Sequence, residues 1–494
     1  MSISTQFRER LKDASLLTDM ALVGGRWRAE SASGQRFDVL DPATGEVIAN
    51  LPDIGIGEAR EAIDAAWAAQ RDWARRTGIQ RSRVLKKWHA LWLEHADDLA
   101  VILTSEQGKP LSEARGEILY GASFLEWFAE EAKRVYGDTI PGHTEATRII
   151  VLKQPVGVVG AITPWNFPNA MIARKVAPAL AVGCAMVAKP ARETPLSMLA
   201  LAVLAERAGL PLDLFSVLTM AGGSAFGKEL SSNPKIAKIT FTGSTEVGRM
   251  LMRQGADQIK RLGLELGGNA PFIVFDDADL DAAVDGAIAS KYRNAGQTCV
   301  CANRLYVQDG VYDAFVERLA ARVSTLRVGN GLDPDTTVGP LINQKGVEKV
   351  EAHLADALAK GARVVRGGNR STLGPLYFEP TVLADVTQQM LVAREETFGP
   401  LAPVIRFGTE EEAIAMANDS EFGLAGYFFA RDIGKVFRVA EAMQVGMVGV
   451  NTGMISTEVA PFGGVKQSGI GREGSKYGID DYLDIKYVCL GIAS

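Results

Sequence analysis

Apolar and polar residues follow the spacing of helices in the first hundred residues. In residues 58–74 and 80–107, alanine, leucine and tryptophan recur every three or four positions among arginine and glutamate. This spacing gathers the apolar side chains on one side of a helix. We therefore predict amphipathic helices over these two ranges.

From residue 157 onward, short apolar and β-branched runs alternate with longer helical stretches. The first series reads VGVVGAI, MIARKVAPALA, AMVAK, PLSMLALAVLAERAG, FSVL and KITFT. A second series follows the glycine-rich segment 263–268, with apolar runs near 272–275, 305–307, 401–405 and 447–450. Strands separated by helices are typical of parallel sheets with helices on both faces. The pattern predicts two α/β units.

Two segments fit neither series, residues 133–154 and 476–492. Both are rich in strand-forming residues, as in RIIVLK and YLDIKYVCL. We interpret them as projecting strands that could join subunits, with edge strands of the core as the alternative.

Composition and charge narrow the class of protein. The 494 residues suggest about three domains at roughly 150 residues each, with 47% hydrophobic and 23% charged residues. The formal net charge is -6 with both signs interspersed, so a nucleic-acid partner is not expected. The N-terminus lacks the apolar core of a secretory signal, and no apolar run approaches the ~18 residues of a membrane helix. We expect a cytoplasmic protein with no membrane partner.

Cysteine and histidine are scarce and scattered. Four cysteines in a chain of this length do not form a disulfide framework, and the four histidines have no spacing suited to zinc. We expect no metal in the site, whereas a free reactive thiol stays possible.

Two segments contain residues that could carry covalent chemistry. In NAGQTCVCANR, Cys299 follows a Gly-Gln-Thr turn at the end of a predicted helix, where a thiol can be exposed and polarised as a nucleophile. A structural cysteine is the alternative. In GLELGGNAP, Glu265 ends an apolar strand, and two glycines allow close approach of the backbone. This acid could otherwise cap a helix or pair with a base.

Two further segments contain candidate donors. AITPWNFP is a strand ending in a proline-framed turn that presents Trp165 and Asn166, and an amide there can donate to a developing oxyanion. FTGSTEVG is a strand, a small-residue turn and a helix start, where free backbone N–H groups can bind phosphate. Each segment alone is also compatible with an ordinary turn.

Taken together and in this order, the segments resemble the aldehyde dehydrogenase superfamily. The resemblance includes PWNFP, AKPARETP, FTGSTEVG, ELGGNAP, GQTC, EETFGP and PFGGVKQSGIGRE, and it covers nearly the whole chain. NAGQTCVCANRLYV, AMIARKVAPALA and GREGSKYGIDDYLDIKY are most similar to the succinate-semialdehyde dehydrogenases.

The resemblance implies a fold and a division into domains. A Rossmann-like dinucleotide-binding domain would comprise residues 1–132 and 155–265, and an α/β catalytic domain residues 266–460. The strands at 133–154 and 476–494 would form a small oligomerisation domain of a homodimer or homotetramer.

The resemblance also implies roles for individual residues. Cys299 would be the nucleophile, Glu265 the base that activates the deacylating water, and Asn166 an oxyanion donor together with the Cys299 backbone N–H. The cofactor would contact Trp165, Lys189, Arg192, Gly243, Ser244, Glu396 and Phe398.

We expect NADP as the cofactor, with NAD as the weaker alternative. Arg192 stands three residues after Lys189, where NAD-preferring relatives commonly carry a glutamate that repels a 2′-phosphate. An arginine offers a planar donor fork suited to phosphate. Glu193 could instead turn towards the ribose, and Arg192 could point into solvent.

The expected substrate is succinate semialdehyde, which is oxidised to succinate. Arg174, Arg293 and Ser456 match positions that bind the substrate carboxylate in the succinate-semialdehyde dehydrogenases, and Arg174 lies about two helical turns beyond Asn166. Pairing of each arginine with a surface acid is the alternative. A glutarate-semialdehyde dehydrogenase, or a broader NAD-using aldehyde dehydrogenase, is the alternative function.

Three further alternatives concern catalysis and the other thiols. A non-catalytic family member has no reason to retain Cys299, Glu265 and Asn166, and a CoA-acylating enzyme has no need of Glu265. Cys184 and Cys489 lie in apolar contexts and are expected to be inert core thiols. Cys301 could form a protective disulfide with Cys299, but we favour the alternative that it is a small residue packing the loop.

Overall fold

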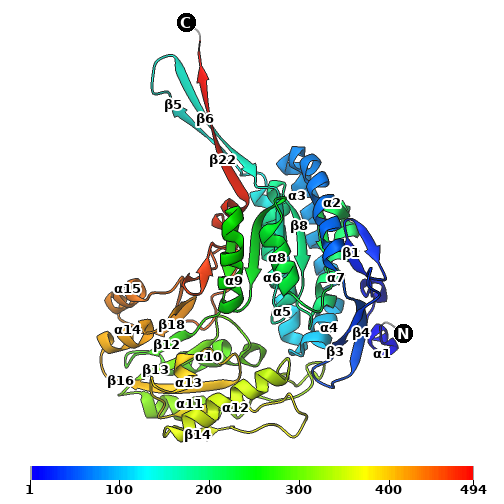
Figure 1. Ribbon diagram of the computed structural model, residues 1–494. Helices are drawn as coiled ribbons and strands as arrows, with labels where there is room; N and C mark the ends of the chain where they lie inside the picture. The colour runs from blue at the N-terminus through cyan, green and yellow to red at the C-terminus, as the bar shows by residue number, and fades with distance from the viewer. Residues whose placement is uncertain (1–2, 493–494) are drawn as a thin grey trace.

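The structure, a computed structural model, describes residues 3–492. Two large sheets, each covered by helices, make up most of the molecule, and a narrow three-stranded sheet projects from it (Figure 1). The fold is α/β as predicted, with two layered units that follow each other along the chain. No helix among the described residues has the length and apolar character that crossing a membrane requires.

The first unit is built on an eight-stranded sheet with the order β2-β1-β9-β8-β7-β10-β11-β21. Strands β7 to β11 are parallel, whereas β1 and β21 pair with their neighbours in antiparallel fashion. The strands are β1 (Ala21–Val23), β2 (Arg26–Arg28), β7 (Val158–Ile162), β8 (Ala185–Lys189), β9 (Phe215–Val217), β10 (Ile236–Thr242), β11 (Arg261–Glu265) and β21 (Gly469–Ile470).

The helices of the first unit fall into two groups that pack among themselves. Helices α3 to α7 contact one another, and α2 contacts α8, which contacts α9. Proline at the first position and a left-handed glycine at the end delimit both α6 and α7. The helices are α2 (Ile56–Arg75), α3 (Gly78–Glu94), α4 (Ala96–Gln107), α5 (Leu111–Glu131), α6 (Pro168–Val182), α7 (Pro195–Ala208), α8 (Ser224–Ser232) and α9 (Thr245–Gly255).

One predicted helix is two helices. The range 80–107 is interrupted at His95, which ends α3 and precedes α4 with φ -101° and ψ 17°. Apolar residues continue across the break because both helices pack into the same core. Periodicity alone therefore did not show the change of direction.

The second unit contains a seven-stranded sheet with the order β14-β15-β16-β13-β12-β18-β19, parallel except for the β14–β15 pair. Its side chains alternate between two apolar clusters, so that Leu305 and Val307 enter one and Tyr306 the other. The strands are β12 (Ala270–Val274), β13 (Ala302–Gln308), β14 (Arg363–Arg366), β15 (Thr381–Ala384), β16 (Leu401–Phe407), β18 (Ala425–Phe429) and β19 (Met447–Val450). The helices are α10 (Leu280–Lys291), α11 (Tyr312–Val323), α12 (Gln344–Ala359), α13 (Leu391–Arg394), α14 (Glu410–Asn418) and α15 (Ile433–Ala442).

The projecting sheet, which we call the arm, combines β5 (Asp138–Pro141), β6 (Thr147–Pro155) and β22 (Leu483–Gly491). Strand β6 pairs with β22 along its whole length, from Pro155 opposite Leu483 to Thr147 opposite Gly491. The arm stands clear of both units in Figure 1. The strands thus form a separate sheet and are not edge strands of the core.

The remaining elements lie around the two units and include N-terminal strands that the sequence pattern did not predict. They are α1 (Thr5–Glu9), β3 (Arg36–Leu40), β4 (Val47–Pro52), β17 (Phe422–Gly423), β20 (Val465–Lys466) and short 3-10 helices at Ala14–Leu16, Leu212–Leu214, Ala256–Gln258, Arg293–Gly296 and Tyr477–Tyr482.

Candidate active site

A cavity of about 730 Å³ lies where the carboxyl ends of β7, β10 and β11 face the loop that precedes β13. Ligands of parallel α/β sheets commonly bind at the carboxyl ends of the strands. The cavity brings together most of the predicted site residues, which come from segments far apart in the sequence. Its wall contains Pro164, Trp165, Asn166, Thr242, Gly243, Ser244, Glu265, Leu266, Gly267, Cys299, Lys349, Glu396 and Phe398.

Cys299 lies on a compact loop after the 3-10 helix Arg293–Gly296. Asn294 and Ala295 adopt φ of 52° and 54°, which turns the chain sharply before the nucleophile candidate. Gly268 permits the loop to approach, because a methyl group there would lie 2.3 Å from the Cys299 carbonyl oxygen. The thiol faces the cavity and is partly exposed. Burial raises its pKa to about 12, and the positive charge of Arg174 opposes this effect.

Asn166 lies in the turn between β7 and α6 and is almost fully buried. Its amide Nδ2 donates a hydrogen bond to the carbonyl oxygen of Gln297 at 3.1 Å. The second hydrogen of the amide is available to a group in the cavity. The amide is therefore held against the Cys299 loop, as expected for an oxyanion donor.

Glu265 ends β11 with its carboxylate buried beside the cavity. Its Oε2 has no hydrogen-bond partner among the described residues. Burial raises its pKa well above the ordinary glutamate value and the negative charge of Glu473 adds to this, whereas Arg174 and Lys175 act in the opposite direction. A carboxylate in these surroundings has a strong affinity for a proton.

Gly243 and Ser244 connect β10 to α9 at the cavity wall. The Ser244 hydroxyl caps α9 by accepting a hydrogen bond from Val247 N at 3.4 Å. Beside them, the buried hydroxyl of Thr242 has no partner among residues 3–492. A helix start and an unpaired hydroxyl facing a cavity suit a phosphorylated ligand.

On the opposite wall, Glu396 accepts a hydrogen bond from Gly268 N at 3.1 Å, and burial raises its pKa to about 7. Phe398 has φ 55° and meets the Trp165 ring edge to face, with centroids 5.5 Å apart. An acid beside an aromatic edge can hold a ribose and position a flat ring. The residues thus fit a dinucleotide.

Lys189 and Arg192 do not line this cavity. Lys189 ends β8, is buried, and donates to the Pro190 carbonyl at 3.0 Å. Arg192 is exposed at a second cavity of about 800 Å³, with Glu193 beside it and its guanidinium 5.9 Å from the centre of the Phe37 ring. Arg192 makes no hydrogen bond to the described residues.

Arg293 and Ser456 lie together at a smaller cavity of about 200 Å³ on the other side of the Cys299 loop, where Thr298 and Val300 also contribute. Arg293 stands in the 3-10 helix and not at the end of α10, which stops at Lys291. Its guanidinium lies 4.9 Å from the centre of the Phe167 ring. The sequence-predicted pair is therefore close in space.

Arg174 lies on α6 as predicted, and its role at the substrate carboxylate stays a prediction. Every residue of α6 is buried, and Arg174 forms an ion pair with Glu473 while its guanidinium lies 4.1 Å from the centre of the Phe462 ring. Helical spacing did not predict its partner Glu473, because that acid comes from a distant part of the sequence. The Nη1 and Nη2 atoms of Arg174 have no hydrogen-bond partner among the described residues.

The other three thiols differ in their surroundings. Cys184 is fully buried, and burial raises its pKa to about 12, as expected of a core thiol. Cys489 is exposed on β22, so its prediction as a core residue is wrong, because the apolar run around it belongs to the arm. Cys301 is buried with Sγ 3.4 Å from the Lys291 carbonyl oxygen, and its disulfide with Cys299 stays a prediction.

Sequence reasoning missed several residues around the cavity. Lys349 on α12 lines the wall, but nothing in its amphipathic helix marked it. The ion pairs of Glu473 with Arg174 and Lys175 join α6 to the C-terminal segment. Among residues 3–492, no group of three or more histidine, cysteine, aspartate or glutamate side chains is arranged to bind a metal ion.

The fold, together with a thiol, an amide and a buried acid on one cavity, defines an aldehyde dehydrogenase. The chain matches the aldehyde dehydrogenase family over residues 27–488 and belongs to that family. The predicted family and enzyme class are confirmed.

Known relatives narrow the comparison further. The chain is 63% identical to a glutarate-semialdehyde dehydrogenase of Pseudomonas aeruginosa over 98% of this chain and 99% of the relative. It is 61% identical to a succinate-semialdehyde dehydrogenase [NADP(+)] of Escherichia coli strain K12, over 98% of this chain and the whole relative. The crystal structure of succinate-semialdehyde dehydrogenase from Burkholderia pseudomallei superposes with a TM-score of 0.96 at 60% identity, covering 98% and 100% of the two chains.

Proposed function

We propose that this enzyme oxidises succinate semialdehyde to succinate through a thioester on Cys299, with NADP as hydride acceptor. The observation that carries the proposal is the single cavity that unites Cys299, Glu265 and Asn166, with Arg293 and Ser456 on the other side of the Cys299 loop. Relatives at 61% and 63% identity are named for succinate and glutarate semialdehyde. Identity alone does not separate the two substrates, which differ by one methylene.

The reaction begins at the thiol. Because burial raises the pKa of Cys299 to about 12, the thiol must lose its proton to solvent before it attacks, and the positive charges of Arg174 and Arg293 favour the thiolate. The sulfur then forms a bond to the aldehyde carbon, and the carbonyl oxygen gains a negative charge. The Asn166 amide and the Cys299 backbone N–H, which makes no hydrogen bond within residues 3–492, are placed to donate to that oxygen.

The bound dinucleotide supplies the acceptor for the hydride released when the alkoxide collapses to the thioester. Gly243, Ser244 and the start of α9 would hold its phosphates, and Glu396 with Phe398 would hold its ribose and ring. Glu265 then accepts a proton from a water molecule, whose oxygen attacks the thioester carbon. The C–S bond breaks, which releases the carboxylic acid and returns the sulfur to Cys299.

We assign the preference for NADP to Arg192, assisted by Lys189. Arg192 has no hydrogen-bond partner among the described residues, so its donors are free for a 2′-phosphate. A difference of ~1.4 kcal/mol would give a tenfold preference. We expect kcat/KM to be at least tenfold higher with NADP than with NAD in the parent, and Arg192→Glu to reverse the preference. A parent that uses both equally, or an unchanged ratio in the variant, would contradict the assignment.

We assign recognition of the substrate carboxylate to Arg293 and Ser456, with Arg174 as a third positive or polar group. The unpaired Nη atoms of Arg174 leave a buried positive charge only partly compensated by Glu473. Charge-assisted hydrogen bonds to a carboxylate contribute about 1.5–3 kcal/mol each. Removing the carboxylate from the substrate should therefore lower kcat/KM by ~10²-fold or more.

The experiment compares succinate semialdehyde, glutarate semialdehyde and butyraldehyde on the parent, Arg174→Ala and Arg293→Ala. Arg318→Ala serves as the matched control, because Arg318 is exposed and pairs with Asp281 at 2.6 Å. We expect the two site variants to lose the preference for semialdehydes and the control to keep it. Equal use of butyraldehyde by the parent would mean a broader aldehyde dehydrogenase.

We infer that the chain forms a homodimer or homotetramer through the arm. The arm would then be the oligomerisation domain predicted for residues 133–154 and 476–494, of which residues 493 and 494 lie outside the described residues. Ile485 and Tyr487 on β22 are 73% and 62% exposed, which is unusual for large apolar side chains on a narrow sheet. Covering these residues with a second copy removes them from water. The cytoplasmic location and the division into cofactor and catalytic domains stay predictions.

A further inference from the structure

A fully buried ion pair lies next to the turn between β7 and α6 that contains Asn166. Lys109, just after α4, contacts Glu117 on α5 with Nζ and Oε2 2.6 Å apart, and neither side chain is exposed to solvent. Removing two opposite charges from water is unfavourable unless further hydrogen bonds compensate. The remaining contacts of the pair therefore indicate its purpose.

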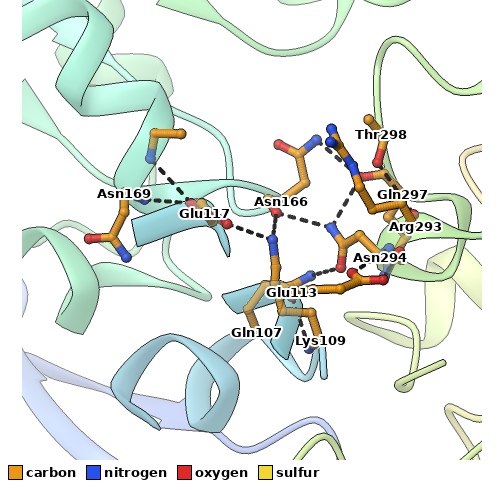
Figure 2. Close-up of polar contacts among 11 residues, drawn as sticks. Gln107, Lys109, Glu113, Glu117, Asn166, Asn169, Arg293, Asn294, Gln297 and Thr298 are labelled. Carbon is orange, nitrogen blue, oxygen red and sulfur yellow. Dashed lines mark hydrogen bonds and ion pairs between the residues drawn. The ribbon is translucent and has the colours of Figure 1, made fainter. Parts of the chain in front are cut away.

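Both ends of the ion pair contact the turn that carries Asn166 (Figure 2). Lys109 Nζ donates to the Asn166 carbonyl oxygen at 2.7 Å. Glu117 Oε1 accepts hydrogen bonds from the backbone N–H groups of Asn169 at 2.9 Å and Ala170 at 3.2 Å. The pair thus holds the turn both at Asn166 and three residues later, in the first turn of α6.

The same part of the chain holds the loop of the nucleophile. Gln107 Nε2 donates to the Asn294 side-chain oxygen at 2.9 Å, and Glu113 accepts a hydrogen bond from Asn294 N at 2.8 Å. Asn294 Nδ2 in turn donates to the carbonyl oxygens of Asn166 at 3.0 Å and Gln297 at 3.2 Å. Residues 107–117 therefore connect the two backbone segments that provide the oxyanion donors.

An internal comparison separates this arrangement from ordinary helix capping. Glu106 is also fully buried and accepts hydrogen bonds from Leu196 N and Ser197 N, both at 2.7 Å, at the start of α7. Glu106 does this without a lysine partner among the described residues. Capping of α6 therefore does not by itself explain Lys109, whose additional contact is the carbonyl of Asn166.

We propose that Lys109 and Glu117 are positioning residues that fix the Asn166 amide relative to the Cys299 backbone N–H. Asn166 belongs to the eight-stranded unit and Cys299 to the seven-stranded unit, so their spacing depends on contacts between the units. The ion pair sets the backbone of one donor, and Gln107 with Glu113 sets the loop of the other. The inference rests on the proposed oxyanion role of Asn166.

The test is a double-mutant cycle between Lys109→Met and Asn166→Ala, measured as the rate constant of the first hydride transfer at saturating NADP and succinate semialdehyde. If Lys109 acts through Asn166, we expect Lys109→Met to slow this step at least tenfold in the parent, but less than threefold when Asn166 is already alanine. Equal slowing in both backgrounds would overturn the positioning role. Should Asn166→Ala alone leave the rate unchanged, the proposed oxyanion role would fail instead.

A second variant covers the case in which Lys109→Met does not fold because Glu117 is left without its cation. Lys109→Met combined with Glu117→Gln removes both charges and keeps an oxygen to accept from Asn169 and Ala170. We expect this variant to bind NADP normally and to show the same slow hydride transfer. The matched control is Glu106→Gln, which changes a buried capping acid that does not contact Asn166 and should keep the parent rate. A parent rate in the double variant would also overturn the inference.

Discussion

The two sides of the reaction cavity differ in how completely their polar groups are paired. On the oxyanion side, the Asn166 carbonyl accepts from Lys109 and Asn294, and its amide donates to Gln297. On the base side, Glu265 Oε2 has no hydrogen-bond partner among the described residues. A donor that must meet a developing charge benefits from a fixed position, whereas a group that gains and loses a proton benefits from an unpaired oxygen.

The largest expected effect distinguishes the two halves of the reaction, formation of the thioester and its hydrolysis. We expect Cys299→Ala to abolish turnover, because the bond to the aldehyde carbon cannot form. Glu265→Gln should still release one equivalent of hydride and then stall, since its amide cannot take the proton from water. Stopped-flow absorbance of reduced cofactor measures both. Cys489→Ala, which removes an exposed thiol on the arm, is the control that should keep full turnover, and steady turnover by Cys299→Ala would contradict the assignment.

A smaller loss is expected on the oxyanion side. Asn166→Ala should slow hydride transfer by about 10²–10³-fold, as removal of one oxyanion donor does in comparable sites. Cofactor affinity, measured by fluorescence titration, should change little because the backbone contacts of residue 166 remain. A loss shared equally between affinity and rate would indicate a displaced turn and not a missing donor.

The smallest expected effect is on the pH dependence of kcat, which depends on the protonation of Glu265 and not on Asn166. Burial and the negative charge of Glu473 raise the pKa of Glu265, so its carboxylate becomes protonated at a higher pH than an ordinary glutamate. Turnover should therefore fall as the pH is lowered through this raised pKa, and recover above it. The pH profile of kcat for the parent measures this acid limb. If Glu473→Gln left the limb at the same pH, coupling between the two acids would not be its cause.

The sequence predicted the residues of the cavity wall better than their electrostatic partners. Asn166, Glu265 and Cys299 stand in short motifs whose turns and strand ends determine local geometry, and they meet at one cavity. The place of Arg174 depended on Glu473, almost 300 positions away, which no local pattern reveals.

The fold could likewise be predicted where local sequence determines an element, but not where the outcome depends on distant residues. Alternating strands and helices predicted both sheets, because each element is specified by its own hydrophobic pattern. The pattern around Cys489 predicts a core strand, yet the residue is exposed, because an apolar strand has the same sequence pattern in a core and in a projecting sheet. The hydrophobic pattern does not reveal the break at His95, because buried apolar residues, Trp92 before it and Ala96 after it, continue across the break.

The arm also imposes an order on biosynthesis. Its central strand β6 is made early, whereas its partner β22 emerges about 330 residues later. At about 5–20 residues per second, the ribosome leaves one edge of the β5–β6 hairpin without a partner for tens of seconds. Leu152 on this hairpin is 43% exposed even in the finished sheet. The β6 edge of this hairpin therefore stays without its partner strand throughout most of the synthesis of the chain.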